Sequence, residues 1–297
     1  ADINGDGYDD LLIGGRDNSD ASTSAGKTYL IFGKKSGWAR DTSLSDADAN
    51  FIGVEREFSG NTVSGAGDVN GDGYDDILIQ AIGHNLPSKA AGKIYLIFGK
   101  KGGWSKNTPL YSANASFIGE NEYDFAGASL SCAGDVNGDG YDDILIGAPG
   151  RDYQRDRPGK TYLIFGKASG WRNRRNTSLL FADAYFIGEW AGDFAGGSVA
   201  GAGDVNGDNF DDFLIGAPYN DEKDMAAGQV YLIFGKKRGW SWQNHLSTAG
   251  ASFWGEDDSD RAGISVAGAG DVNGDMYDDI VIGASFDEEG DLSAGQT

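Results

Sequence analysis

The chain has 297 residues, of which 39% are hydrophobic and 12% aromatic, so the composition predicts a folded protein and excludes a disordered acidic tail. The formal net charge of −22 argues against nucleic acid and anionic membrane surfaces as partners, because both would repel the chain, and it favours bound cations. The single cysteine, Cys132, excludes an internal disulfide bond, and no apolar run is long enough to insert across a membrane.

An acidic phrase recurs five times along the chain. It reads ADINGDGYDD at the start, GDVNGDGYDD twice, then GDVNGDNFDD and GDVNGDMYDD, and the first Asp of successive phrases is separated by 66, 67, 69 and 67 residues. Such constant spacing is typical of a repeat architecture. The repeat units span approximately residues 1–61, 62–128, 129–197, 198–264 and 265–297, and the first and last are incomplete. We interpret residues 1–297 as one region.

Each complete unit contains four short apolar segments in a fixed order. In the first unit LLIGG starts at Leu11, KTYLIFGK starts at Lys27, and NFIG ends at Gly53 after a loop with a Gly-Trp pair. The later units add a segment of small residues, such as SVAGAG, before the acidic phrase, and the last unit stops after IVIGAS. These segments are bounded by Gly and lack a 3.6-residue period, so they predict strands.

Four strands per repeated unit predict an all-β fold, a β-propeller of four-stranded antiparallel blades. The small residues of SVAGAG suit the innermost strand, where blades crowd the axis. We count three strands in the first unit, four in each of the next three and two in the last, which gives four to five visible repeats. We therefore expect part of a larger ring or array, completed by further repeats of the same chain or by another chain.

The acidic phrase has the pattern of a calcium-binding loop. Numbered from its first Asp, it carries oxygen-bearing side chains at positions 1, 3, 5 and 9, and Gly at position 6 in three of the five copies. Alternating Asp and Asn with such a Gly wraps oxygens around a calcium ion, and the residue at position 7 would add its backbone carbonyl. Asp at position 9 would close the site, whereas Asp at position 8 is expected to point away into solvent. An EF-hand is excluded because position 12 is Ile in all five copies.

The sequence thus predicts up to five Ca²⁺ sites, each in the turn of a β-hairpin. The alternative is a set of Asp/Asn/Gly turns without metal, but three carboxylates converging on one turn repel each other unless a cation is present. The five phrases hold 20 of the 46 acidic residues, and five Ca²⁺ ions would reduce the net charge from −22 to −12. The candidate ligands are Asp2, Asn4, Asp6, Tyr8 and Asp10; Asp68, Asn70, Asp72, Tyr74 and Asp76; Asp135, Asn137, Asp139, Tyr141 and Asp143; Asp204, Asn206, Asp208, Phe210 and Asp212; and Asp271, Asn273, Asp275, Tyr277 and Asp279.

The five loops are not expected to be equal. Position 6 is Gly in the first three loops, Asn209 in the fourth and Met276 in the fifth. Asn tolerates the left-handed conformation that this position requires and Met tolerates it poorly. We therefore expect the loop at Asp271 to be the weakest calcium site.

These motifs carry a family resemblance over essentially the whole chain. Phe-x-Gly precedes the loop at Phe58, Phe125 and Phe194, D-x-N-x-D-G-x-x-D forms it, and Gly-Ala-Pro follows it at Gly147 and Gly216. The combination resembles the FG-GAP repeat of the integrin α-subunit β-propeller, and the shared GKxYLIFGKxxGW is similar to extracellular bacterial FG-GAP arrays. The resemblance implies about seven blades, structural calcium and ligand recognition by other loops. The last repeat departs from the pattern, since Arg261 replaces the Phe, which leaves its local turn geometry open.

The face opposite the calcium loops is the better candidate for recognition, because its loops vary between repeats. Residues there include His84, Arg151, Asp152, Tyr153, Arg155, Tyr219, Asn220 and Asp221 between the second and third strands, and Tyr123, Trp190 and Asp257 between blades. On the calcium side the recurring Trp38, Trp104, Trp171 and Trp240 predict packing between blades, with a sugar-stacking platform as the alternative.

The leading functional hypothesis is a calcium-stabilised extracellular propeller, secreted or at the cell surface, that serves in adhesion, ligand binding or structure. Its partner would be a protein or a glycan. A polysaccharide-acting enzyme or its accessory domain, and a lectin-like glycan binder, are the alternatives. No catalytic residues can be assigned, because the two histidines fall at unrelated repeat positions and Cys132 replaces a small inner-strand residue.

Overall fold

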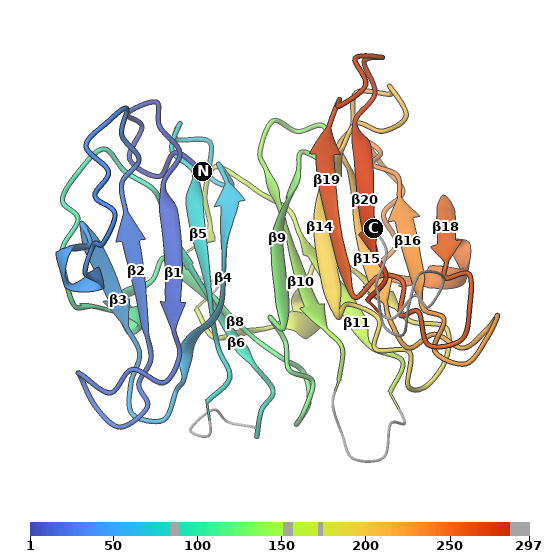
Figure 1. The fold of residues 1–297 in the computed structure, drawn as a ribbon, viewed down its shortest axis with the longest axis horizontal. Helices are drawn as coiled ribbons and strands as arrows, with labels where there is room; N and C mark the ends of the chain where they lie inside the picture. Colours follow the sequence, from blue (N-terminus) through green and yellow to red (C-terminus); the bar gives the residue numbers. More distant parts are fainter. Residues whose placement is uncertain (84–88, 151–156, 172–174, 286–297) are drawn as a thin grey trace.

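The computed structural model describes residues 1–83, 89–150, 157–171 and 175–285, and these residues form β-sheets that follow the repeat (Figure 1). The first sheet contains β1 (Leu11–Gly15), β2 (Lys27–Ile31) and β3 (Ala49–Ile52). The second contains β4 (Ser59–Gly67), β5 (Asp76–Ala81), β6 (Lys93–Ile97) and β8 (Ala115–Ile118). The expected order of strands is confirmed in both.

The remaining sheets repeat the arrangement. The third is built from β9 (Ser129–Gly134), β10 (Asp143–Ala148), β11 (Lys160–Ile164) and β13 (Ala184–Ile187), and the fourth from β14 (Ser198–Gly203), β15 (Asp212–Ala217), β16 (Gln229–Ile233) and β18 (Ala251–Trp254). The last pairs β19 (Ser265–Gly270) with β20 (Asp279–Gly283). Neighbours within each blade are antiparallel, as in β9–β10–β11–β13. The all-β architecture of four-stranded blades is therefore confirmed.

Three short strands were not anticipated. β7 (Thr108–Pro109), β12 (Thr177–Ser178) and β17 (Gln243–His245) pair in parallel with β3, β8 and β13, the outermost strands of the preceding blades. The 3-10 helices Leu110–Ser112, Leu179–Phe181 and Leu246–Thr248 follow them, and Leu44–Asp46 occupies the same place in the first unit. Each loop with a Gly-Trp pair therefore crosses over to the blade before it.

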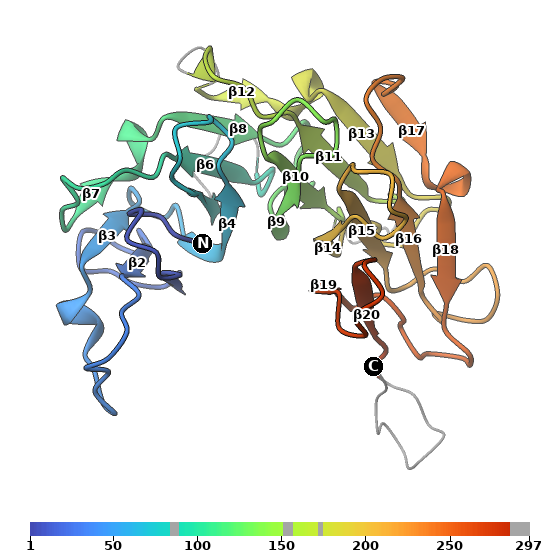
Figure 2. The same cartoon turned by 90° about the horizontal axis from the view of Figure 1, so that it is seen from above.

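The sheets stand around an arc, seen from above in Figure 2. The inner strands β4, β9, β14 and β19 lie on its concave side, and β12 and β17 lie outside. A Cβ atom on Gly201 would lie 2.8 Å from the carbonyl oxygen of Cys132, and one on Gly268 would lie 2.6 Å from that of Gly201. The small residues of SVAGAG are therefore required where inner strands approach one another, as expected.

The hydrophobic core lies between neighbouring sheets. Ile144 and Ile146 of β10 pack in the cluster shared with the second blade, whereas Leu145 packs in the cluster shared with the fourth. Every residue of β5, β10 and β15 is buried. Burial of both faces explains why these strands are continuous apolar runs instead of alternating ones.

The recurring Trp side chains fill the seams between blades. The ring centroid of Trp104 lies 6.3 Å from that of Phe32 and 6.2 Å from that of Phe51, both in the preceding blade. Trp171 packs on Phe98 at 6.1 Å and Trp240 on Phe165 at 5.9 Å, all in edge-on geometry. The packing role is confirmed for these three, while Trp38 of the first unit is 52% exposed.

Replacing a seam Trp should destabilise the chain far more than replacing Trp38. Trp171→Ala removes a buried side chain and should lower the free energy of unfolding by roughly 3 to 5 kcal/mol. Trp38→Ala, the same change at an exposed copy, should cost less than about 1 kcal/mol. Urea unfolding of the two variants measures the difference, and equal losses would contradict the seam role.

Candidate metal centre

The acidic phrases form hairpin turns at one end of the blades. The loop of residues 68–75 joins β4 to β5, and the equivalent loops join β9 to β10, β14 to β15 and β19 to β20. Asp72 lines the same cavity of about 390 Å³ as Trp104. The candidate calcium loops and the Gly-Trp loops therefore share one face, as expected.

The Asp at position 1 organises the loop. In the second loop one carboxylate oxygen of Asp68 accepts hydrogen bonds from the amides of Gly71 (2.7 Å) and Asp72 (3.0 Å), and the other accepts one from Gly73 (2.8 Å). Equivalent bonds recur in the loops of Asp2, Asp204 and Asp271. The first Asp thus pulls three backbone amides of its own turn together.

The Asp at position 9 is held inside the blade. Asp76, Asp143 and Asp212 are fully buried, and one oxygen of each accepts a hydrogen bond from a glycine amide that follows the third strand, at 2.7–2.8 Å. Desolvation raises the pKa of Asp76 and Asp143 to about 8 and that of Asp212 to about 6, and the nearby Asp residues at positions 1 and 5 add to the rise. Burial of these carboxylates disfavours their charged form unless a cation lies beside them.

The types of donor in the loops suit a calcium ion, and one of these donors in the first loop lacks a partner. The side chain of Asn4 is only 8% exposed, and its carbonyl oxygen has no hydrogen-bond partner, although its amide donates to Asp6 at 3.1 Å. Across the residues with described positions, no three His, Cys, Asp or Glu side chains converge closely enough to hold a metal. The carboxylates instead accept backbone amides, which leaves free lone pairs on their oxygens. Asn and Asp oxygens are the ligands that calcium prefers.

Position 6 has the backbone that the sequence predicted. Gly7 and Gly73 have φ of 87° and Gly140 has 90°, while Asn209 has 65° and Met276 has 75°. Met276 therefore adopts the left-handed conformation with its side chain 88% exposed. The Met276 amide donates to Asp271 at 2.9 Å, as the position 6 amides of other loops do to their first Asp, while the left-handed backbone costs an L-residue roughly 1–2 kcal/mol.

The expectation that Asp at position 8 is solvated is wrong for four of the five loops. Asp75, Asp142, Asp211 and Asp278 each accept a hydrogen bond from the amide of the first Asp in the preceding loop, at 2.7–2.9 Å. Only Asp9, which meets the chain's amino terminus, is exposed, at 86%. A signal was present in the sequence: Asp at position 8 and Gly at position 4 recur in all five phrases.

The variable-loop face contains fewer free side chains than expected. Tyr219 packs on Phe194 with ring centroids 5.0 Å apart, and buried Asn220 donates to Asp193 and Tyr231. Trp190 is 60% exposed, and Asp221 and Asp257 are also exposed. Tyr123 is partly buried, and the candidates that lie outside the described residues are His84, Arg151, Asp152, Tyr153 and Arg155.

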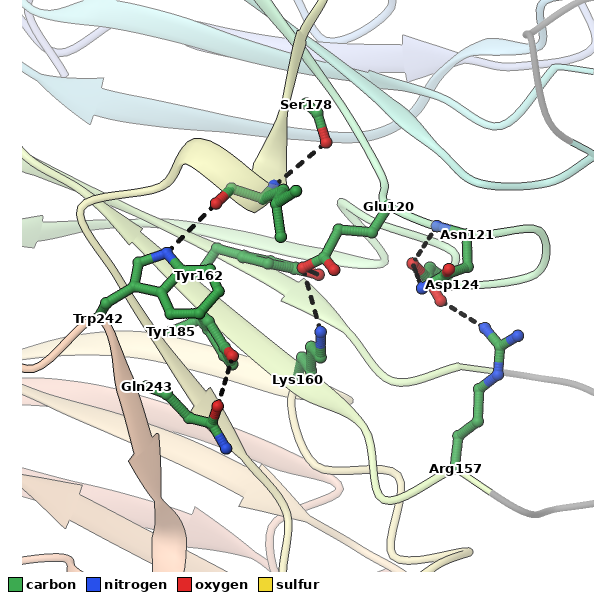
Figure 3. Close-up of polar contacts among 11 residues, drawn as sticks. Glu120, Asn121, Asp124, Arg157, Lys160, Tyr162, Ser178, Tyr185, Trp242 and Gln243 are labelled. Atoms are coloured by element: carbon green, nitrogen blue, oxygen red, sulfur yellow. Dashed lines mark hydrogen bonds and ion pairs between the residues drawn. The ribbon is translucent and has the colours of Figure 1, made fainter.

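A polar cluster that was not predicted from the sequence joins neighbouring blades at this end (Figure 3). Glu120, in the loop after β8, accepts hydrogen bonds from the hydroxyl of Tyr162 (2.7 Å) and from Lys160 (3.1 Å), both on β11. Arg157 pairs with Asp124 beside it. Tyr95 with Glu57 and Tyr231 with Glu189 repeat the tyrosine–glutamate bond in the flanking blades. The Tyr of YLIF is therefore an inter-blade donor in the second, third and fourth blades.

Cys132 packs as a small inner-strand residue, as expected. Burial raises the pKa of its thiol to about 12, so the sulfur is protonated at neutral pH and is a poor nucleophile.

Removing Glu120 should weaken the seam between the second and third blades. Glu120→Ala leaves the buried Tyr162 hydroxyl without its acceptor and should lower the free energy of unfolding by about 2 kcal/mol. Glu122→Ala, two residues away and exposed, is the matched control and should change it by less than about 0.5 kcal/mol. Chemical denaturation measures both, and similar values would rule out the inter-blade role.

Relief of the strain at Met276 should strengthen the last loop. Met276→Gly should stabilise the loop-closed state by roughly 1 kcal/mol and tighten calcium binding there by about fivefold. Asn209→Gly, at the same position of the fourth loop, should gain less, because Asn tolerates this backbone. Calcium titrations of both variants test the ranking, and a larger gain at Asn209 would contradict it.

Comparisons with known proteins agree with the repeat. The FG-GAP repeat model matches residues 59–97, 127–164 and 195–233, which start at or within a few residues of inner strands β4, β9 and β14 and end at the third strand of each blade. The chain is 29% identical over 214 residues to integrin alpha-4 of Xenopus laevis, covering 72% of this chain and 18% of that protein. It is 28% identical over 229 residues to integrin alpha pat-2 of Caenorhabditis briggsae, with 73% and 17% covered.

A relative with a different name also matches. Phosphatidylinositol-glycan-specific phospholipase D of Bos taurus is 34% identical over 193 residues, which cover 63% of this chain and 22% of that protein. The chain thus spans about a fifth of the length of these curated relatives. Within that span the strands, the acidic hairpins and the three matched repeats agree, so the chain contains three FG-GAP repeats and is similar to integrin α subunits.

Proposed function

We propose that this chain is a calcium-stabilised extracellular β-propeller module that serves in adhesion or ligand binding, in a secreted or cell-surface protein. The similarity to integrin α subunits supports the adhesive role. No helix among the described residues is both long and apolar enough to cross a membrane.

The observation that carries the calcium proposal is the combination of buried carboxylates and an unpartnered buried amide oxygen in the repeated loops. Asp76, Asp143 and Asp212 are buried at position 9, and the oxygen of Asn4 lacks a partner at position 3. A bound Ca²⁺ would supply the missing positive charge and a partner for that oxygen. The candidate ligands of each loop would be the side chains at positions 1, 3, 5 and 9 and the carbonyl at position 7.

The ligand would bind at the variable-loop face. The candidate calcium loops and the Trp side chains between blades lie at the opposite end. The variable loops instead expose Trp190, Asp221 and Asp257 to solvent. Exposed acidic groups suit a protein loop carrying basic residues, and an exposed aromatic ring suits a glycan that stacks on it. The net charge of −22 disfavours nucleic acid.

Chelation tests the calcium role directly. Loops of extracellular type bind calcium at roughly 10⁻⁴ to 10⁻³ M, so about 1 mM Ca²⁺ should add up to about 1.4 kcal/mol of stability per occupied loop. We expect EGTA to lower the melting temperature markedly and Ca²⁺ to restore it. Excess Mg²⁺ should restore it poorly, because magnesium prefers a tighter octahedral site.

Asp72→Ala and Asp139→Ala, each lacking an exposed loop carboxylate, should reduce the calcium-dependent rise. An identical melting temperature in EGTA and in calcium would overturn the proposal.

A further inference from the structure

Each of the first four acidic loops contacts the loop of the next blade through the same pair of hydrogen bonds. The amide of Asp68 donates to a carboxylate oxygen of Asp142 at 2.8 Å, and the amide of Asp142 donates to the carbonyl of Asp68 at 3.3 Å. The same reciprocal pairs join Asp2 to Asp75, Asp135 to Asp211 and Asp204 to Asp278. The residue at position 1, a candidate calcium ligand, is therefore fixed by a residue of the following blade.

Two glycines in each of the second, third and fourth loops leave room for the side chains of the next loop. A Cβ atom on Gly67 would lie 2.1 Å from a carboxylate oxygen of Asp142, and one on Gly71 would lie 2.5 Å from the ring of Tyr141. The contact recurs between Gly5 and Tyr74, between Gly138 and Phe210, and between Gly207 and Tyr277. At Gly270 and Gly274, with no described loop against them, a Cβ would meet nothing within 4 Å. The aromatic ring at position 7 thus covers the turn of the loop before it.

Three consecutive residues therefore contact two different loops. The ring of Tyr141 and the carboxylate of Asp142 contact the loop of residues 68–76, while the buried carboxylate of Asp143 belongs to its own loop. The backbone of residues 141–143 links the two loops. A change in the conformational freedom of one loop should therefore change that of the other.

We propose that the calcium loops are coupled in series, with Asp75, Asp142, Asp211 and Asp278 as positioning residues that fix the first ligand of the preceding loop. This proposal rests on calcium binding as proposed above. Calcium in one loop orders its position 8 carboxylate and position 7 ring, so the preceding loop loses less conformational freedom when it binds its own ion. Coupling of this kind is positive cooperativity without a change of fold.

Hydrogen exchange of the full chain against free calcium tests the coupling loop by loop. In Asp142→Ala the calcium midpoint for protection of residues 68–76 should rise about tenfold, because the charge-assisted bond to the Asp68 amide is lost. The loop of residues 271–279, separated from it by two other loops, should keep its midpoint. Asp142→Asn, which retains one acceptor oxygen, should give an intermediate shift.

Asp9→Ala is the matched control. It makes the same change at position 8 of the first loop, where the carboxylate pairs with the amino group of Ala1 and its side chain is 86% exposed. The midpoints of the four later loops should stay within about twofold of the unchanged chain. A tenfold shift there would show that removing any loop charge weakens calcium binding, and it would overturn the positioning role.

A second variant keeps the test free of charge effects. Tyr141→Ala retains the backbone carbonyl but removes the ring over Gly71, so the midpoint of residues 68–76 should rise several-fold. Tyr111→Ala, at an exposed tyrosine away from the loops, should leave it unchanged. If Asp142→Ala lowers overall stability too far, this pair decides the question.

The outcomes separate this proposal from the calcium proposal. If no loop of the unchanged chain gains protection with calcium, calcium binding itself is wrong. If the loops respond but both Asp142→Ala and Tyr141→Ala leave the midpoint of residues 68–76 in place, or move every loop equally, the coupling is wrong. A shift centred on residues 68–76 in either variant, with both controls unchanged, supports it.

Discussion

The structure depends on one constraint: each inner sheet is buried on both faces by its neighbours. Ile144 and Ile146 of β10 contact one neighbouring blade and Leu145 contacts the other. No blade can bury its apolar surface alone, so the stability of each repeat comes largely from its seams. Among the described residues β1 and β20 have a neighbouring sheet on one side only, and both strands are partly exposed, in agreement with this constraint.

The two ends of each seam are held by different chemistry. On the calcium side a Trp from the following blade inserts between aromatic rings, and position 8 carboxylates bind the amides of the preceding loop. On the other side a Tyr hydroxyl of the third strand donates to a Glu of the preceding blade, as in Tyr162 and Glu120. Both contacts recur from seam to seam, so the loops beyond them can vary in sequence without disturbing the blade stack. A rigid scaffold that carries variable loops is the usual arrangement for recognition.

The sequence was sufficient for the strands, their order and the hairpin loops, because each follows from a pattern within one repeat. The recurrence of Trp at one repeat position was also sufficient to predict its packing between blades, but the other contacts between repeats were not predicted. The pattern of the acidic phrase correctly predicted that the Asp142 side chain points away from its own loop. It did not predict that this side chain accepts a hydrogen bond from Asp68 of the preceding blade instead of facing solvent. The parallel strands β7, β12 and β17 were missed for the same reason, since two or three residues carry no periodicity.

The replacement of Phe by Arg261 in the last Phe-x-Gly does not change the backbone conformation of that turn, contrary to what the change of side chain suggested. Arg261 replaces the Phe of the last Phe-x-Gly, yet its φ of 57° matches the 52–57° of Phe58, Phe125 and Phe194. The Arg261 guanidinium lies 5.0 Å from the ring centroid of Tyr219, where Phe194 also packs, so a cation–π contact supports the turn there. The turn is thus imposed by the neighbouring blade.

The same reasoning applies to the acidic loops. Their ligand side chains are nearly identical, but a loop in the middle of the stack has a carboxylate and an aromatic ring against it, whereas the loop of residues 271–279 has neither among the described residues. If the loops bind calcium as proposed, the affinity of a loop would therefore depend on its place in the stack as well as on its own candidate ligands.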